Sequence, residues 1–354
     1  MSTVLKFKSG LRPNPQRPII SIGTINVDQL MGPVTHWPDP GTETVYPDYE
    51  MRVGGGLGNF GAALKALGAH QHMVVNVGDD AMGDWLQGQF GALADHWHRS
   101  QTVTSVTIGM THADKERTFL SNEGHSSVFD ADMVRAMLRG IKLDGAIALV
   151  VGSFLMPRLL PDCADILAEL RQAGAIVALD TAWPTGGWSN AVQAHLESWL
   201  GHVDVLLIND AEAAGILGIS VADFDGDVDG ALARIADKLH DDAIIVIKRG
   251  ASGATAFSHG AITHVPVPEH VDVVDTVGAG DCFNAGFLMA LQQNADLENA
   301  LRAGIDVAGK AIASQPRRYP ELSDLRTDVA ATLAGGKNTP VQMHTQTFDQ
   351  VENS

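Results

Sequence analysis

The amino-acid sequence predicts an α/β fold with a doubly wound, mostly parallel sheet and a small antiparallel β lid. Short apolar, β-branched runs alternate with amphipathic stretches of helical periodicity, which is the pattern of repeated βα units. Two other segments alternate polar and apolar residues with a period of two, outside any βα unit. In a sheet of this kind, ligands bind beyond the carboxyl ends of the strands.

The strands of the main sheet are expected where apolar runs are nearly continuous, because a strand buried on both faces shows no alternation. These runs are Ile19–Ile25, Met73–Val77, Ile147–Val151, Ile176–Leu179, Val205–Ile208 and Ile244–Ile247. The helices expected between them include Asn59–Leu67, Pro161–Gln172, Ala211–Leu217 and Ala231–Leu239. Gly68 and Gly174 lie where the first two of these helices should end, since glycine readily adopts the left-handed conformation that closes a helix.

The lid is expected from residues 31–53 and 101–121, the two segments with alternating patterning. Alternation is typical of strands with one buried and one solvated face, so these segments predict a small antiparallel sheet beside the main one. Such a sheet would exclude water from the cleft. Within it, Arg117 is expected either to face solvent beside Lys115 and Glu116 or to reach an acidic substrate.

Composition and charge narrow the class of protein. A single domain is expected over residues 19–335, with loose polar tails at 1–18 and 336–354. The net charge of −18 disfavours a nucleic-acid partner, which would need a basic surface. No signal peptide or membrane-spanning apolar run is visible. Because Cys163 and Cys282 show no disulfide or metal spacing, we expect a cytoplasmic protein with reduced thiols.

The stretch ending at Asp281 carries the strongest chemical signal. Val271–Val274 predicts a strand, and Gly278-Ala279-Gly280-Asp281 predicts a tight turn into a helix. Amide N–H groups at a helix N-terminus form a cradle for an anion, which the helix dipole reinforces. At the edge of that cradle, the Asp281 carboxylate is placed to take the proton of a hydroxyl that attacks a phosphoryl group. The structural alternative is an aspartate that only caps the helix.

A second glycine-rich stretch, Gly56–Gly61, matches GxGxxG and offers a competing hypothesis. Dinucleotide-binding folds place a ribose-binding acid about 20 residues after this motif, and Asp79 is so placed. The preceding residues, Tyr49–Val53, alternate and do not have the pattern of a buried first strand. A dinucleotide-dependent oxidoreductase is therefore a less favoured alternative.

Several motifs together resemble the ribokinase-like (PfkB) family of carbohydrate kinases over about residues 19–325. Asp275–Asp281 is similar to the C-terminal signature of that family. The residues similar to its N-terminal signature are Gly54, Gly55, Asn59, Gly68 and Gly78. Shorter elements that also match are Gly23–Asp28, Trp37–Thr44, Asn209 with Glu212, and Lys248 with Gly250 and Gly253.

The resemblance implies a role for each of these motifs. Asp281 would be the general base, and the amides of Gly278, Ala279 and Gly280 would hold the transferring phosphoryl group. The residues that would bind sugar hydroxyls are Asn26, Asp28, Gly54, Gly55 and Asn59, with Asp28 expected at the end of a strand. The residues that would bind ATP are Asn209, Lys248, Gly250 and Gly253.

The resemblance also implies two ion sites. Asn209 and Glu212 would hold Mg²⁺ through water, which suits an ion that keeps several of its waters. The structural alternative is that this pair only caps a helix. Asp275 and Val277 would hold a monovalent cation such as K⁺. The stretch Gln315–Arg318 replaces a glycine-containing loop that helps to bind this cation in some relatives, which leaves potassium dependence open.

The sequence therefore predicts an ATP-dependent, Mg²⁺-requiring phosphotransferase that acts on a hydroxyl of a small sugar. Val150–Ser153 lacks the glutamate that ribokinases proper use to bind sugar, which disfavours ribose itself. A nucleoside kinase on the same fold, the oxidoreductase and a non-catalytic sugar or nucleotide sensor are the alternatives. Exposed edges of the lid, together with the resemblance, predict a homodimer formed through the lid.

Overall fold

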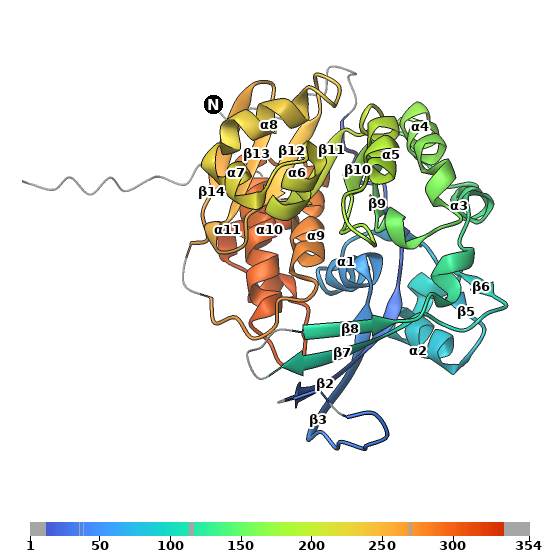
Figure 1. Cartoon of the computed structure of the whole chain (residues 1–354). Coiled ribbons are helices and arrows are strands. Elements are labelled where there is room, and N and C mark those ends of the chain that lie inside the picture. The colour runs from blue at the N-terminus through green and yellow to red at the C-terminus, as the bar shows by residue number, and fades with distance from the viewer. Residues whose placement is uncertain (1–11, 35, 38, 113–116, 269–270, 336–354) are drawn as a thin grey trace, which may run out of the picture.

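The computed structural model describes residues 12–34, 36–37, 39–112, 117–268 and 271–335. Its main layer is an eight-stranded sheet with the order β14-β13-β12-β11-β10-β9-β1-β4 (Figure 1). The strands β12, β11, β10, β9, β1 and β4 run parallel to one another. β13 and β14 extend the sheet beyond β12 and are antiparallel. The bounds are β1 Ile19–Gly23, β4 Gln71–Val74, β9 Ile147–Val151, β10 Ile176–Asp180, β11 Val205–Asn209, β12 Ile244–Lys248, β13 Ala254–Ser258 and β14 Ala261–Val265.

The predicted doubly wound, mostly parallel sheet is confirmed. The run Ile147–Val151 coincides with β9, and four other runs lie within two residues of a strand. The run Met73–Val77 is divided, because β5 (Asn76–Gly78) leaves the main sheet and pairs with β6 (His98–Ser100). The antiparallel β13–β14 pair was not predicted.

Helices cover both faces of the sheet (Figure 1). On one face lie α1 (Gly56–Ala66), α2 (Ala81–Phe90), α9 (Ala279–Gln292), α10 (Leu297–Ile312) and α11 (Thr327–Leu333). On the other lie α3 (Ala131–Leu138), α4 (Cys163–Gln172), α5 (Asn190–Leu200), α6 (Asp210–Leu217), α7 (Val221–Gly226) and α8 (Val228–Ala236). Gly68 and Gly174 follow α1 and α4 with φ of 72° and 85°, as predicted for helix ends.

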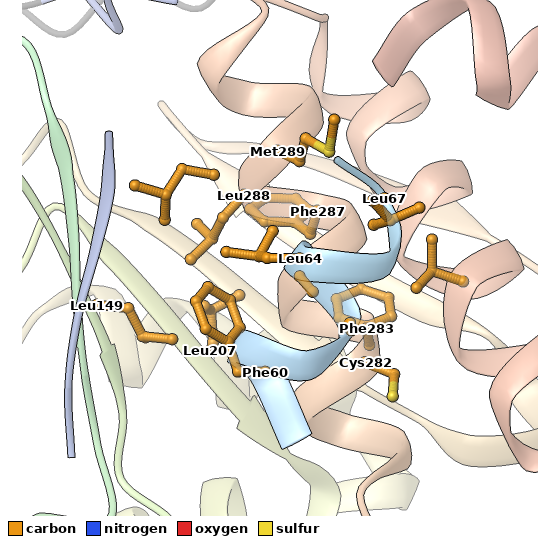
Figure 2. Packing of buried hydrophobic residues seen from close by; sticks show 14 of the residues in the cluster. Phe60, Leu64, Leu67, Leu149, Leu207, Cys282, Phe283, Phe287, Leu288 and Met289 are labelled. Atoms are coloured by element: carbon orange, nitrogen blue, oxygen red, sulfur yellow. The ribbon is translucent and has the colours of Figure 1, made fainter. Parts of the chain in front are cut away.

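Alternate residues of each buried strand enter two separate cores. In β9, Leu149 packs in the core under α1 and α9, whereas its neighbour Val150 packs in the core on the opposite face. Figure 2 shows Phe60 of α1 and Phe287 of α9 meeting in the first core. Burying such a side chain contributes about 1.5–3 kcal/mol to folding. This packing fixes α1 and α9 against each other and against the sheet.

The lid is a four-stranded sheet with the order β3-β2-β7-β8. Its strands are β2 Asn26–Val34, β3 Asp48–Gly54, β7 Val106–His112 and β8 Arg117–Ser121. The outer pairs are antiparallel as expected, while β2 and β7 in the middle run parallel. The lid begins at Asn26, after only two residues that follow β1, so Asp28 lies inside a lid strand and not at the end of a main-sheet strand. The placement predicted for Asp28 is wrong because the chain turns out of the main sheet earlier than its apolar run suggests.

The segment before α9 also differs from the prediction. Val271–Val274 is not a strand, and Val273 and Val274 are 49% and 40% exposed. The run does not pair with the edge strand β14; at its end, the N–H groups of Val274 and Asp275 donate to the Ile312 carbonyl in α10 at 3.0 and 3.1 Å. The β-branched composition alone suggested a strand. As a result, α9 begins after an irregular loop and not after a βα turn.

The predicted tails lie mostly outside the described residues, which include neither 1–11 nor 336–354. Residues from Asn14 onward are hydrogen-bonded to the body of the protein: Asn14 N donates to the Gly145 carbonyl at 2.9 Å, and Arg17 Nε donates to the Asp144 carbonyl at 3.1 Å. Pro38, Lys115 and Glu116 also lie outside the described residues. Within the described part, no helix has both the length and the apolar character needed to cross a bilayer.

Candidate active site

The carboxyl ends of three neighbouring strands bring polar side chains to one edge of the main sheet. Asp180 ends β10, Asn209 ends β11 and Lys248 ends β12. Asn209 and Lys248 are register partners, so their side chains start from adjacent positions. Asp180 is not among the predicted site residues. Its signal was present, since it is the first polar residue after a buried strand and therefore lies where such sheets bind ligands.

Lys248 is held by two partners. Its Nζ donates to Asp180 Oδ2 at 2.7 Å and lies 3.5 Å from Asn284 Oδ1. Asn284, which is fully buried in α9, donates in turn to the same oxygen of Asp180 at 2.6 Å. Burial lowers the pKa of Lys248, but the carboxylates of Asp180 and Glu212 raise it by more. The lysine therefore stays charged beneath the start of α9.

The start of α9 is built around Gly278. Its φ of 75° is one that side chains rarely adopt, and an added Cβ would lie 2.8 Å from Cγ of Asn59. The amides of Gly280 and Asp281 lie in the first helical turn, where no carbonyl of the helix can reach them. Ala279 was also predicted to donate to the phosphoryl group, but its N–H is not free, because it donates to the Thr276 carbonyl at 3.1 Å. The amides that remain available for the predicted cradle are therefore those of Gly278, Gly280 and Asp281.

Asp281 is positioned by a relay of hydrogen bonds. Asn59 Nδ2 donates to Asp281 Oδ2 at 3.0 Å, and the Tyr319 hydroxyl donates to Asn59 Oδ1 at 2.8 Å. Tyr319 thus fixes which end of the Asn59 amide faces the carboxylate. On the other side, a Cβ on Gly56 would lie 3.6 Å from Asp281 Oδ1, so the first turn of α1 closely approaches the carboxylate. Two helix N-termini converge on this side chain.

The surroundings of Asp281 favour its protonated form. Burial, and after it the charge of Asp180, raise the pKa of Asp281 to about 7. Lys248 and the Asn59 hydrogen bond act in the opposite direction. The carboxylate is enclosed by protein on most sides, yet it keeps a partly exposed edge toward the cleft. A carboxylate with a pKa near neutrality can both accept and release a proton at ordinary pH.

Of the predicted sugar-binding residues, Asn26, Asp28 and Gly54 lie together in the lid, whereas Gly55 directly follows the lid strand β3 and Asn59 lies in α1. Asn26 Nδ2 donates to Asp28 Oδ1 at 2.6 Å and to Thr107 Oγ1 at 3.0 Å. Gly54 lies opposite Asn26, and an added Cβ would overlap the Asp28 carboxylate. At Gly55, an added Cβ would lie 2.8 Å from Asn26 Oδ1. Because both glycines lack a side chain, the polar side chains of Asp28 and Asn26 have room beside them.

The register of the lid adds residues that the sequence reasoning missed. Arg52, Asp28, Thr107 and Ser121 lie side by side across the four strands, so they share one face. Thr107 Oγ1 and Ser121 Oγ are 2.8 Å apart. Period-2 alternation shows which residues share a face within one strand, but not which residues of two strands are neighbours. The polar row could therefore be found only from the strand pairing.

Asn209 and Glu212 form a capping box at the start of α6. Asn209 Oδ1 accepts from Glu212 N at 2.8 Å, and Glu212 Oε2 accepts from Asn209 N at 2.9 Å. The pair therefore caps α6, which is the structural alternative that the sequence left open. Burial and the nearby Asp180 raise the pKa of Glu212 to about 7. In the described part of the chain, no group of three His, Cys, Asp or Glu side chains is close enough to hold a metal ion directly.

These residues fit Mg²⁺ that is bound mainly through water. Asp180, Glu212 and Asp281 influence one another electrostatically, and Lys248 is the positive charge among them. The local excess of negative charge favours a cation, while the spacing of the carboxylates excludes a direct cage. Mg²⁺ commonly keeps several waters and uses few protein ligands, which matches this donor set.

Gly250 and Gly253 lie in the turn from β12 to β13. Gly250 begins a single 3₁₀ turn with φ of 52°, and it borders open space. Gly253, with φ of 89°, packs so closely on the Val265 carbonyl that no Cβ would fit. The described contacts of Gly253 are with the end of β14 and not with the residues around Asp281.

Asp275 does not fit a monovalent-cation site. Its Oδ1 accepts from Arg117 Nη1 at 2.7 Å and from Val277 N at 2.9 Å. Its Oδ2 accepts from Arg52, and its carbonyl accepts from Arg317 Nη2 at 2.7 Å. At about 4 Å and an effective dielectric constant of about 20, a second cation beside a guanidinium meets a repulsion of about 4 kcal/mol. The neighbours of these oxygens are already positive.

Arg117 does not face solvent, which was one of its two predicted placements. Its side chain is only 14% exposed and is paired with Asp275. The two residues are 158 positions apart in the sequence, so the local pattern around Arg117 does not reveal that Asp275 is its partner.

Comparison with known proteins agrees with this geometry. Residues 17–321, most of the chain, match the pfkB family carbohydrate kinases. The protein belongs to this family.

This pfkB family kinase is similar to characterised relatives over nearly its whole length. It is 24% identical to ribokinase of Haemophilus influenzae over 300 residues, which cover 83% of this chain and 92% of that protein. Ribokinase of Arabidopsis thaliana, solved with ribose and ATP, has a TM-score of 0.71 at 20% identity and covers 90% of this chain and 98% of that one. Phosphofructokinase-2 of Escherichia coli, solved with potassium, has a TM-score of 0.70 at 21% identity and covers 90% of this chain and 100% of that one. At such identities the solved structures establish the fold alone.

As a member of the pfkB family, the protein is an ATP-using phosphotransferase with a hydroxyl group as acceptor. The dinucleotide hypothesis has no support in the structure. The strand before Gly56 is β3, a lid strand and not the first strand of the parallel sheet. Asp79, the proposed ribose ligand, pairs with Arg99 at 3.0 Å.

Proposed function

We propose that this kinase transfers the γ-phosphoryl group of ATP to a hydroxyl of a small carbohydrate, with Asp281 as the general base. One observation carries the proposal: the Asp281 carboxylate lies in the first turn of α9, beside free backbone amides, and closely approaches the N-terminus of α1. Asn59 holds it at 3.0 Å, and burial raises its pKa to about 7. A base at this pKa is ionised often enough at neutral pH to accept the proton of an attacking hydroxyl.

The acceptor would lie between the lid and Asp281. Asn26, Asp28, Thr107 and Ser121 form a continuous polar surface there, with the donors and acceptors that hydroxyl groups need. Asp28 is buried, and burial raises its pKa. A bound hydroxyl would supply a hydrogen bond that offsets this cost. The same surface would accept the ribose of a nucleoside, so a nucleoside kinase is the alternative.

The phosphoryl group would be held by amides and charge at the start of α9. The N–H groups of Gly278, Gly280 and Asp281 would donate to its oxygens as negative charge develops. Lys248 lies directly beneath, since a Cβ on Gly280 would be 3.4 Å from its Nζ. Because Asp180 fixes Lys248, the lysine would stabilise the phosphates without pairing with the base.

Asn209 and Glu212 would hold Mg²⁺ through water at the end of β11. When bound there, the ion would neutralise charge on the ATP phosphates. The Glu212 oxygen that is not used in the capping box is the donor available for such a water. Hydrogen bonding by Asn209 keeps the glutamate in one orientation.

The outer face of the lid supports a homodimer. Met51, Gln29, Ile108 and Leu120 form a row across the four strands on the face opposite Asp28. Leu120 is 52% exposed, and Tyr49 on the same face is 59% exposed. β3 and β8 are edge strands with unpaired backbone groups. Pairing of two lids would cover the exposed Leu120 and Tyr49 side chains and an edge.

Asp281→Asn tests the base. The amide has nearly the same shape but cannot take a proton, so turnover should fall by about 10²–10⁴-fold while ATP binding persists. ADP release with a panel of pentoses, hexoses, 2-keto-3-deoxy acids and nucleosides measures turnover, and calorimetry measures nucleotide binding. Asp79→Asn is the control and should behave as wild type. Near-normal turnover of Asp281→Asn would show that another group is the base, and a response to nucleosides alone would favour the alternative acceptor.

The dependence of kcat/KM on pH tests the electrostatics. With an ionised base, kcat/KM should rise with pH and level off above the pKa of Asp281, which is about 7. Asp180→Asn removes a charge that raises this pKa and leaves Lys248 less neutralised, so the acid limb should move to lower pH. Asp84→Asn, an exposed carboxylate in α2, is the control. An acid limb that stays in place in Asp180→Asn contradicts the assignment.

Glu212→Gln tests the magnesium site. The glutamine carbonyl can still accept from Asn209 N, so the cap persists, but its charge is lost. The Mg²⁺ concentration for half-maximal activity at saturating ATP should rise by about tenfold, which corresponds to about 1.4 kcal/mol. The matched control is Asp223→Asn, the equivalent acid in the capping box of α7. If Glu212→Gln and Asp223→Asn reach half-maximal activity at the same Mg²⁺ concentration, Glu212 caps α6 and does not hold the ion.

Leu120→Asp tests the dimer. Placing a carboxylate on the outer lid face, at the edge strand β8, should convert a dimer into a monomer, as measured by size-exclusion chromatography with light scattering. Ile262→Asp, an exposed position on the edge strand β14, is the control and should remain dimeric. A monomeric mass for the wild-type protein at high concentration is the result that contradicts this proposal.

A further inference from the structure

We infer that the guanidinium of Arg317 takes the place of a monovalent cation beside Asp275, so that phosphoryl transfer requires no potassium. Arg317 is thereby a positioning residue for the loop that leads to the phosphate cradle. The inference rests on the proposed function, because it concerns how the residues ahead of Asp281 are held. It starts from the mismatch between the oxygens of Asp275 and a cation site.

Each oxygen of Asp275 already has a donor. Arg317 Nη2 donates to the carbonyl at 2.7 Å and lies 3.4 Å from Oδ2. Arg52 contacts the same Oδ2, while Arg117 and the amide of Val277 occupy Oδ1. A cation that used these oxygens would have to displace a guanidinium, which carries the same unit of charge and more directed donors.

The charges around Asp275 balance without an added ion. Three guanidinium groups, from Arg52, Arg117 and Arg317, face the carboxylates of Asp275, Asp28 and Glu50. Arg52 lies 4.0 Å from Asp28 Oδ2 and 3.9 Å from Glu50 Oε1. A further cation would leave this cluster with a positive excess in a largely buried place.

Arg317 is fixed in its position. Its side chain is 2% exposed, and its backbone N–H donates to Glu50 Oε1 at 3.2 Å. Its Nε and Nη1 are buried without a hydrogen-bond partner among the described residues. Burial raises the pKa of the Cys282 thiol to about 12, and the Arg317 charge acts against that rise, so the guanidinium also lies close to the first turn of α9.

This position explains what the guanidinium does. It holds the Asp275 carbonyl at the start of the loop, and its charge acts on Cys282, one residue after the proposed base. Between these two residues lie the amides of Gly278, Gly280 and Asp281. Holding the start of the loop in place keeps those N–H groups directed at one point, which is a requirement for stabilising a developing charge. Without the Arg317 guanidinium, a bound potassium ion would have to hold the Asp275 carbonyl in its place.

The first experiment exchanges the salt. Wild-type activity and thermal stability are measured in potassium, sodium and tetramethylammonium chloride at equal ionic strength. We expect kcat and the KM for ATP to change by less than about twofold, and the midpoint of unfolding to show no preference for potassium. A potassium-specific rise in kcat of about tenfold, or a potassium-specific gain in stability, would overturn the inference. If no acceptor is phosphorylated in any salt, the proposed function fails, and the stability measurement still decides the cation site.

The second experiment removes the charge. Arg317→Ala should lower kcat by about 10²-fold, since a small displacement of catalytic groups has an effect of this size. Added guanidinium ion or potassium should restore part of kcat, because either can enter the vacated space, and Arg317→Lys should retain more activity than Arg317→Ala. Arg318→Ala, whose side chain is 72% exposed, is the matched control and should keep wild-type activity.

Rescue distinguishes positioning from a merely structural role. Restoration of kcat in Arg317→Ala by guanidinium or potassium, with no such effect on Arg318→Ala, supports the inference. A folded Arg317→Ala protein that neither ion activates contradicts it. Should Arg317→Ala not fold, the salt exchange on the wild-type protein decides the question by itself.

Discussion

Burial of the Lys248 ammonium beneath the start of α9 sets the charge balance of the whole cleft. Lys248 is held by Asp180 at 2.7 Å, but Glu212 and Asp281 also lie within its electrostatic reach. One buried cation cannot fully neutralise three carboxylates, and at short range each uncompensated pair costs several kcal/mol. Burial and this shortage together raise the pKa of both Glu212 and Asp281 to about 7. In the proposed function, the same excess of negative charge would favour a divalent cation and would give the base a pKa near neutrality.

Asp281 also depends on two helices that the core holds together. Phe60 and Leu64 of α1 pack against Phe287 and Leu288 of α9 (Figure 2), which brings the N-termini of both helices to the same carboxylate. Their dipoles favour the ionised form and so act against burial. The pKa of Asp281 is therefore a balance of large opposing effects. A displacement of α1 would alter both the Asn59 hydrogen bond and the dipole, so the packing of the core is linked directly to the chemistry.

Local patterns in the sequence predicted the parts of this structure that depend on local properties. The buried strands follow from continuous apolar runs, and the tight turn at Gly278 with the helix start after it follows from glycine conformation. Residues that act through distant partners were missed, among them Asp180 with Asn284, and Thr107 with Ser121. The interpretations of Val271–Val274 as a strand and of Arg117 as a solvated residue were wrong. In both cases the outcome depends on whether a tertiary partner is present, and composition does not carry that information.

The cluster around Asp275 connects the two halves of the cleft. Arg52 lies in the polar row of the lid beside Asp28, yet its guanidinium contacts Asp275 in the loop before the phosphate cradle. Arg117 makes the same connection from β8, and Glu50 accepts from the backbone of Arg317. Ion pairs that are buried so deeply are costly unless every partner is present, so the lid strands and the loop are stable in this arrangement only together. In the proposed function, an acceptor bound at Asp28 would therefore be linked to the amides at Gly278 through Arg52 and Asp275, so that acceptor binding and phosphate positioning would share one network.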